Sequence, residues 1–123
     1  MKPSLCTSLV LCCFLGGCAV EGTLTWEDEI GPLIVSECGG CHGGADPESN
    51  LRFDTRENLL SLESTQTDLM LVEPGAHIDS YLWHKLANTQ LIAGGSGSAM
   101  PQGAQLDPVD IDIVAEWIDA GAE

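Results

Sequence analysis

A helical pattern of apolar residues begins shortly after residue 24. The positions that form one face are Trp26, Ile30, Leu33 and Ile34. Their offsets of 0, 4, 7 and 8 match the period of an α-helix, and Thr25 with an acid three positions later fits an N-terminal capping pattern. We predict a helix from about Thr25 to Gly39. A late start or a bend is expected at Pro32, because proline lacks a backbone donor.

The clearest helical pattern lies at the end of the chain. Asp107 suits the N-cap, Pro108 the first helical position, and Gly121 the C-terminal end. The apolar face consists of Ile113, Val114, Trp117 and Ile118. The opposite face carries Asp112, Glu116 and Asp119. This amphipathic pattern predicts a helix that packs on the core through its tryptophan side.

Shorter helices are predicted between these two. A helix over residues 54–62 and another over residues 79–86 both begin with residues that favour the N-cap. The pattern of the second places Leu82 and Leu86 on a buried side and leaves Lys85 in solvent. A glycine-rich loop, residues 93–103, then leads to the last helix. No convincing pair of strands appears, so the sequence predicts one small all-α domain with long loops.

The first residues are typical of an export signal. Lys2 precedes an apolar run over residues 5–15, which is far shorter than the roughly 20 residues that a membrane-spanning helix needs. Leu15-Gly16-Gly17-Cys18 resembles the lipobox of bacterial lipoproteins, which implies cleavage before Cys18 and acylation of that cysteine. The alternative is an ordinary signal peptide with incidental cysteines. We predict a signal peptide over residues 1–17, a lipid-bearing cysteine and tether over 18–24, and the folded domain over 25–123.

The cysteines do not form a disulfide framework. Of the six cysteines, the signal peptide would remove Cys6, Cys12 and Cys13. With Cys18 carrying lipid, Cys38 and Cys41 remain in the folded domain. A small exported domain without disulfides often needs a metal or cofactor to complete its core.

The segment Cys38-Gly39-Gly40-Cys41-His42 is compatible with three chemistries. Thiol–disulfide exchange usually places such a motif after a strand in a βαβ unit, which this sequence lacks. Zinc would need a fourth ligand from His77 or His84, and adjacent Cys41 and His42 are awkward on one ion. Covalent haem uses both thiols as thioether links to the vinyl groups and the next histidine as an axial ligand. The motif therefore favours one covalently bound haem c.

A low-spin haem needs a second axial ligand on the other side of the iron. We predict Met100, which lies 58 positions after His42 in the glycine-rich loop and is followed by Pro101. Met70 is a rival, although its apolar surroundings favour a core position. His77 in a loop and His84 on a helix would give bis-histidine ligation instead, and we expect His84 to lie at the surface.

These residues resemble a known family. The resemblance is carried by Cys38, Cys41, His42, Met100, Pro101 and the terminal segment Glu116-Trp117-Ile118-Asp119-Ala120-Gly121-Ala122. The chain is similar to class I c-type cytochromes, and most of all to the planctomycete-type cytochrome c domain. Residues 30–34, 51–54 and 80–82 follow the same pattern, whereas the long stretch 87–98 departs from it.

The resemblance implies a particular architecture. It implies a haem cradled by crossing N- and C-terminal helices, with His42 and Met100 as axial ligands. Trp26 and Trp117 are expected at the helix crossing, where they can serve the core and also contact the haem. Trp83 is compatible with either the haem edge or plain core packing.

The charge of the chain limits its partners. With 19 acidic and 4 basic residues the formal net charge is −15, which disfavours nucleic acid and anionic lipid and favours a basic redox partner. Solubility or adaptation to a salty habitat explains the same charge equally well.

The sequence thus predicts a lipid-anchored monohaem cytochrome c that carries single electrons in the bacterial cell envelope, with no catalytic side chain. Ala19, which follows the lipid cysteine, lacks the acid that retains some lipoproteins at the inner membrane, so the outer membrane is favoured. Two alternatives stay open. One is a haem sensor or peroxidase-like protein with a labile sixth ligand, and the other is a haem-stabilised accessory subunit of an envelope complex.

Overall fold

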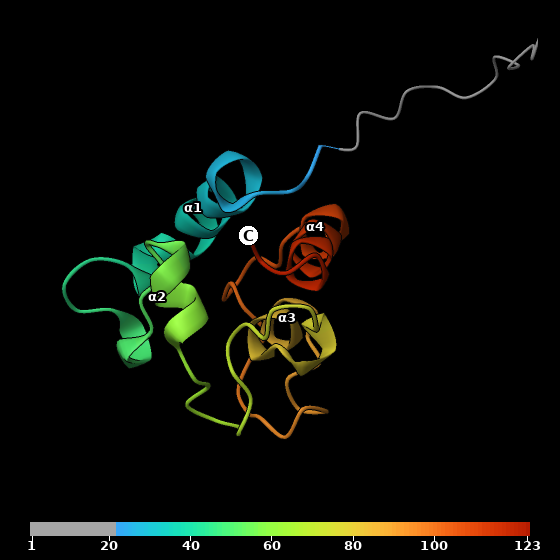
Figure 1. Cartoon of the computed structure of the whole chain (residues 1–123). Helices are drawn as coiled ribbons and strands as arrows, with labels where there is room; N and C mark the ends of the chain where they lie inside the picture. Colours follow the sequence, from blue (N-terminus) through green and yellow to red (C-terminus); the bar gives the residue numbers. More distant parts are fainter. Residues whose placement is uncertain (1–21) are drawn as a thin grey trace, which may run out of the picture.

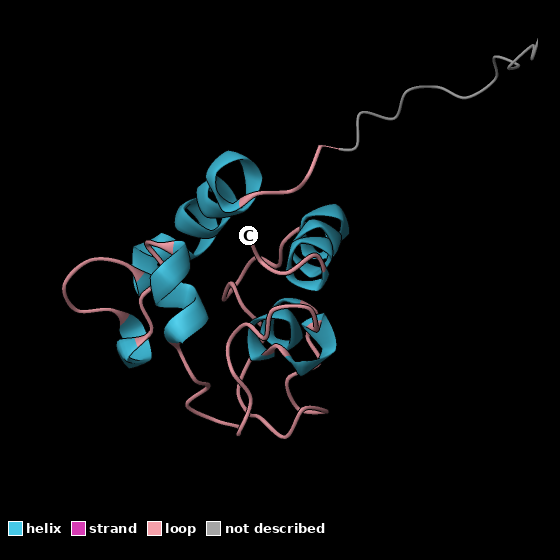
Figure 2. Ribbon diagram, in the orientation of Figure 1, coloured by secondary structure: helices cyan, strands magenta, loops and turns pink. Residues whose placement is uncertain are grey.

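The structure, a computed structural model, describes residues 22–123. Its helical elements (Figures 1 and 2) are a π-helical turn Trp26–Ile30, α1 Gly31–His42, α2 Arg56–Ser61, α3 Tyr81–Leu86, α4 Pro108–Asp119, and short 3₁₀ turns at Glu48–Asn50 and His77–Asp79. Residues 22–123 contain no strand, and an isolated bridge joins Glu63 to Met70. The all-α prediction is confirmed. The predicted signal peptide and the predicted lipid attachment at Cys18 lie outside the described residues.

None of the helices within residues 22–123 combines the length and the apolar composition needed to cross a bilayer.

The N-terminal helix begins as predicted at Thr25, whose hydroxyl accepts from the Asp28 amide at 3.2 Å. Its first turn is wider than an α-helix, because the Ile30 amide bonds the Thr25 carbonyl five residues back. The α-helical part starts at Gly31, next to Pro32, which has no N–H to give the Asp28 carbonyl. The expected disturbance at Pro32 is therefore a change of helix type.

The predicted end of this helix at Gly39 is wrong, because α1 continues through His42. Gly39 and Gly40 tolerate the helical conformation, and the chain leaves it at Gly43, whose backbone is extended. A Cβ at Gly43 would lie 2.6 Å from the Gly39 carbonyl oxygen. The glycine that ends the helix is thus the one after the histidine, which leaves both cysteines and His42 on one rigid element.

The two ends of the domain meet around Trp117. This side chain is fully buried, its ring centroid lies 6.0 Å from that of Trp26, and its Nε1 donates to the Glu123 carbonyl at 2.8 Å. The Trp26 amide donates to the same carbonyl at 3.0 Å. Gly31 leaves room for the Trp26 indole, because a Cβ there would lie 2.9 Å from its Nε1. The first turn of the N-terminal helix and α4 are therefore packed together, as expected.

The predicted capping positions are correct, but not every side chain caps its helix. Thr55 accepts from the Asn58 amide at 3.1 Å and caps α2. Ser80 precedes α3, yet its buried hydroxyl accepts from the Glu73 amide at 2.8 Å and donates to the Ala76 carbonyl at 2.9 Å. Asp107 precedes α4 without a side-chain cap bond. Ser80 therefore fixes the preceding loop instead of the helix.

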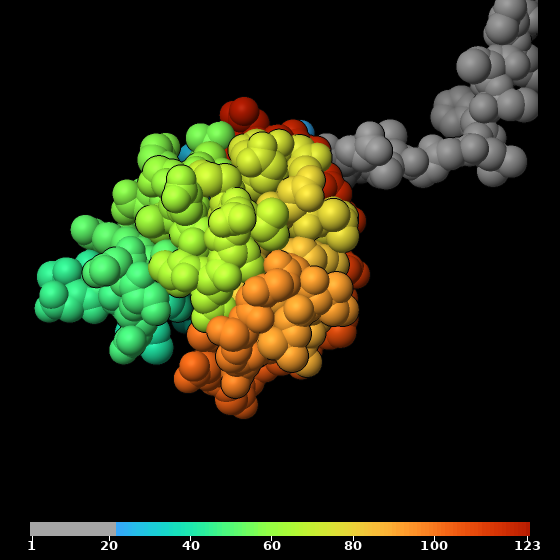
Figure 3. Space-filling model, turned by 90° about the horizontal axis from the view of Figure 1, so that it is seen from below, coloured from blue at the N-terminus to red at the C-terminus, as the bar shows by residue number. Residues whose placement is uncertain are grey.

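The core lies between α1, α3 and α4. Its fully buried side chains include Ile30, Ile34, Leu59, Val72, Leu86, Val114, Trp117 and Ile118. Leu82 and Leu86 are buried as predicted. The loop after α1 projects from this body, teal to green in Figure 3, so residues 38–42 at the end of α1 lie where the body meets an exposed loop.

Candidate functional site

A cavity of about 480 Å³ opens beside the end of α1. This volume falls in the range of roughly 300–1,000 Å³ that is usual for pockets of small molecules and cofactors. Its apolar walls include Leu51, Phe53, Leu71, Leu82, Leu86 and Pro101. The predicted site residues Cys38, Cys41, His42 and Met100 all line it. The structure therefore brings together four residues that are up to 62 positions apart in the sequence.

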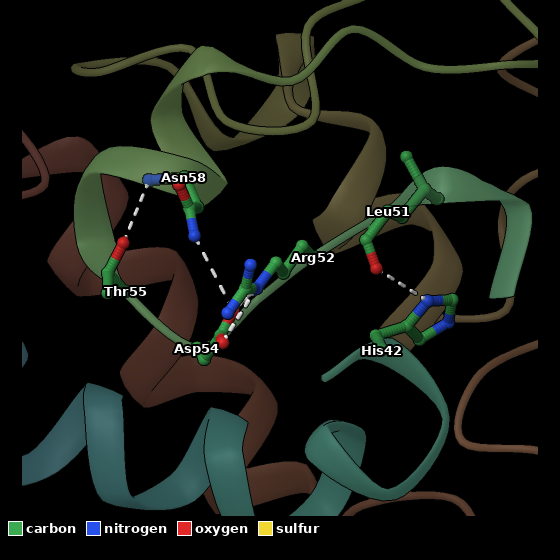
Figure 4. Close-up of polar contacts among 6 residues, drawn as sticks. All are labelled: His42, Leu51, Arg52, Asp54, Thr55 and Asn58. Carbon is green, nitrogen blue, oxygen red and sulfur yellow. Dashed lines mark hydrogen bonds and ion pairs between the residues drawn. The ribbon is translucent and has the colours of Figure 1, made fainter. Parts of the chain in front are cut away.

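His42 is held in one orientation by the segment that follows α1 (Figure 4). Its Nδ1 lies 3.2 Å from the Leu51 carbonyl oxygen, which can only accept, so Nδ1 carries the proton. The Phe53 ring stacks on the imidazole with centroids 4.6 Å apart, and the Phe53 amide donates to the His42 carbonyl at 2.7 Å. The Nε2 lone pair is left for a metal, which is the usual arrangement of a metal-binding histidine.

The segment that orients His42 is itself tied down. Arg52 Nε lies 2.8 Å from both carboxylate oxygens of Asp54, and Asn58 Nδ2 reaches Asp54 at 3.5 Å (Figure 4). The hydrogen bond from Arg52 lowers the pKa of Asp54 below its ordinary value. The sequence marked residues 51–54 as part of the family pattern. It did not reveal that the Leu51 carbonyl accepts a hydrogen bond from the imidazole.

The two thiols differ in their surroundings. Cys38 is buried and Cys41 is exposed, and neither is in a disulfide. Burial raises the pKa of the Cys38 thiol to about 11, with smaller contributions from Glu37 and Cys41. A redox-active pair usually has a lowered thiol pKa, so this environment argues against thiol–disulfide exchange.

The zinc alternative loses its fourth ligand. His77 Nδ1 donates to Asp119 at 2.7 Å, and neither His77 nor His84 is among the described residues that line the cavity. Within residues 22–123 no group of three or more histidine, cysteine or acidic side chains is arranged to hold a metal ion. For the same reason, neither histidine is placed to act as a second ligand in the cavity that His42 lines.

His84 is buried, which contradicts the predicted surface position. Its Nδ1 lies 2.8 Å from the Thr89 hydroxyl and its Nε2 lies 2.8 Å from the Ile78 carbonyl. Because both ring nitrogens are used within the fold, His84 joins the 3₁₀ turn before α3 to the turn after it. His84 therefore has a structural role on α3, and neither of its ring nitrogens is left free to bind iron.

Of the two candidate methionines, Met100 lines the cavity and Met70 does not. Met70 is half-buried, and its backbone pairs with Glu63 and accepts from the Tyr81 amide. Trp26, Trp83 and Trp117 are also absent from the described lining of the cavity. Trp83 instead packs edge-on against His77 and His84, at centroid distances of 4.7 and 5.2 Å. These tryptophans therefore pack within the fold and are not contacts of the cavity.

The predicted solvation of Lys85 is wrong. Lys85 is half-buried and lines the cavity. Burial lowers the pKa of its amine, because the charged form loses water. Glu37 and Glu48 line the same cavity, and both are exposed, so the cavity mouth is acidic on the side of the cysteines.

The hydrogen bonds between His77 and Asp119 lead to a prediction about stability and pH. The His77 backbone amide and ring both donate to Asp119, and these bonds lower the pKa of that carboxyl from its ordinary 3.8. A lowered folded-state pKa means that the stabilisation is present above the ordinary value and is lost as pH falls through the lowered one. Asp119→Asn should therefore destabilise the haem-loaded protein at about pH 7, by an amount that shrinks below about pH 4.

Urea unfolding over this pH range measures the difference. Asp112→Asn is the matched control, because Asp112 is exposed on the same helix and should show little pH-dependent effect. A loss for Asp119→Asn that stays constant on acidification would contradict the role given to the Asp119 carboxylate.

The helical fold and the histidine-bearing cavity define a cytochrome c-type domain. A family model described as Planctomycete cytochrome C matches residues 38–102 of this chain, which is more than half of it. The chain belongs to this family, whose members are haem-binding electron carriers with covalently bound haem c. No curated protein and no solved structure matches the chain.

Proposed function

We propose that this protein is a lipid-anchored monohaem cytochrome c that carries single electrons in the bacterial cell envelope. Cys38 and Cys41 would hold the haem through thioether bonds, and His42 and Met100 would be its axial ligands. When bound, the haem supplies the iron that is oxidised and reduced by one electron. Protein side chains bind and orient the haem and exclude water from it.

The observation that carries this proposal is the orientation of His42. Its Nδ1 donates to the Leu51 carbonyl, and the Phe53 ring supports one side of the imidazole, so Nε2 is the nitrogen available to iron. Met100 lines the same cavity from a distant loop. A histidine nitrogen and a methionine sulfur are the axial ligands found in cytochromes c, and methionine raises the reduction potential relative to a second histidine.

The cavity lining fits a large flat apolar group. Leucine, phenylalanine and proline side chains form much of the wall, and Cys38 and Cys41 lie at its edge on the last turn of α1. Glycines occupy both positions between the cysteines, and a Cβ at Gly40 would meet no atom within 4 Å. Backbone without side-chain bulk can approach a flat ring closely.

Haem content tests the proposal. Protein co-expressed with haem-maturation machinery should contain one haem per chain that resists acid–acetone extraction. The haem-to-protein ratio from pyridine haemochrome absorbance gives the number directly. Colourless protein with two reactive thiols in the folded domain would contradict the proposed function.

We also infer a lipid anchor at Cys18 and an outer-membrane location, from the Leu15-Gly16-Gly17-Cys18 sequence and from Ala19. Two or more acyl chains would give stable membrane binding. Mass spectrometry of the mature N-terminus tests this inference. An acylated Cys18 supports the anchor, and an unmodified N-terminus elsewhere would refute it.

A basic redox partner is the corresponding proposal for the electron-transfer surface. The exposed thiol Cys41 is next to a projecting loop with exposed Asp46 and Glu48, and Glu37 is exposed one turn earlier on α1. Negative charge around the exposed side of the cavity would guide a positively charged protein to it.

A further inference from the structure

The loop that carries Met100 is bonded to the rest of the domain along its length. In residues 96–100, the backbone groups of Ser96, Gly97, Ser98 and Met100 all have partners outside the loop. Figure 3 shows this orange segment lying against the yellow-green segment that precedes α3. The long glycine-rich stretch is thus fixed by contacts distant in sequence.

Lys85 makes three of these five hydrogen bonds. Its Nζ donates to the carbonyls of Ser96 and Ser98, both at 3.0 Å, and its own carbonyl accepts from the Met100 amide at 3.0 Å. The Nζ also lies 5.9 Å from the centre of the Tyr81 ring. One residue of α3 therefore contacts the loop on both sides of residue 99, using its side chain and its backbone.

The partners of Lys85 are unexpected in so acidic a protein. The chain has 19 acidic residues, yet Lys85 forms no ion pair within residues 22–123. Hydrogen bonds from a charged donor are roughly twice as strong as those between neutral groups. The half-buried ammonium therefore donates to two loop carbonyls. An apolar side chain could not make these two bonds.

Two glutamines also bind the loop that carries Met100. Gln66 Oε1 accepts from the Ser96 amide at 3.0 Å and from the Tyr81 hydroxyl. Gln90 Nε2 donates to the Gly97 carbonyl at 3.0 Å, and its side chain is buried. Gly95 packs against Tyr81 so closely that a methyl group there would collide with the hydroxyl. These contacts add to those that Lys85 makes with the loop.

We propose that Lys85 is a positioning residue for Met100, and that its bonds to the Ser96 and Ser98 carbonyls hold the methionine at the cavity. This inference rests on the proposed function, in which Met100 is an iron ligand. Without the bonds from Lys85, the glycine-rich loop would open more often and release the thioether more often. A loop that opens locally is detected by faster amide exchange and by faster access of an external ligand.

The test compares Lys85→Leu, Lys85→Arg and Arg56→Leu in the haem-loaded protein. Leucine keeps an apolar side chain, removes the donors and brings no ligand atom to the cavity, whereas arginine keeps donors and charge. Arg56 is the matched control. It donates to the Ala122 carbonyl at 2.6 Å and pairs with Glu123 at 3.6 Å, so its loss removes a cation and a tertiary contact far from the loop in sequence.

Three readouts are measured for each variant. They are the thioether-to-iron charge-transfer band of the oxidised protein, the rate of carbon monoxide binding to the reduced protein, and amide hydrogen exchange of residues 94–100. For Lys85→Leu we expect loss or weakening of the band and an increase of about tenfold in both rates. Lys85→Arg should keep most of the band, and Arg56→Leu should leave all three readouts near wild type.

The outcomes separate this inference from the proposed function. A wild-type protein without the band would overturn Met100 ligation itself, and the role of Lys85 with it. A wild-type protein with the band, together with an unchanged Lys85→Leu variant, would overturn the positioning role alone. A shifted reduction potential with an unchanged band and unchanged exchange would also overturn it, because Lys85 would then act through its charge.

Discussion

Met100→Ala should abolish the thioether-to-iron charge-transfer band of the oxidised protein and allow the reduced protein to bind carbon monoxide readily. Alanine has no ligand atom, so the position opposite His42 would be left to water or to an external molecule. The reduction potential should fall as well, because a methionine ligand raises it. Optical spectra and a redox titration of the purified variant measure all three effects.

Met70→Ala is the matched control for this experiment. Met70 is half-buried and is not among the described residues that line the cavity, so its replacement should leave the iron spectrum unchanged. Persistence of the band in Met100→Ala, or its loss in Met70→Ala alone, would transfer the ligand role to Met70. The charge-transfer band of the two variants therefore shows which methionine is the iron ligand.

Replacing both Cys38 and Cys41 by serine should remove all covalently attached haem. A serine hydroxyl cannot form the thioether, so any haem present would be extracted by acid–acetone. Each single variant should keep one link and bind haem less securely. Mass spectrometry of the intact chain distinguishes these states by the mass of the attached haem.

Folding of these variants needs its own check, since Cys38 is buried and a serine there would place a hydroxyl in an apolar environment. Cys38→Ala with Cys41→Ala avoids this cost and should give the same result. A haem that still resists extraction from both double variants would show that the attachment is elsewhere. Reduced expression with normal covalent haem in either single variant would point to a folding defect only.

Local sequence signals predicted much of the architecture. Thr25 and Thr55 cap helices where their neighbours suggested, and the apolar face of α4 is buried through Val114, Trp117 and Ile118. These features depend on residues within one or two turns of each other. The general preferences of residues at helix ends, together with the helical period, therefore suffice to locate these helices.

Features that depend on distant contacts were not predictable in this way. His84 was expected at the surface and Lys85 in solvent, yet one is buried between two turns and the other clamps a loop. Their roles are set by residues such as Ile78 and Ser98, which the fold brings near. A helical pattern gives the side of a helix on which a residue lies, but not what covers that side.

The same reasoning applies to the candidate site. The Cys-x-x-Cys-His motif predicted Cys38, Cys41 and His42 as site residues, and the Met-Pro pair predicted Met100. Residue type and spacing were sufficient for these predictions. The Leu51 carbonyl, which orients the imidazole, has no signal in its side chain. Backbone groups are available at nearly every residue, so only the folded chain reveals which one faces His42.

Spectroscopy during a redox titration of the mature haem-loaded protein tests the central claim most directly. The proposed function predicts a single one-electron transition, low-spin iron in both oxidation states, and a thioether-to-iron band in the oxidised form. High-spin resting iron that binds carbon monoxide in the folded wild-type protein would contradict this claim. It would identify the haem instead as the centre of a sensor or a peroxidase-like protein.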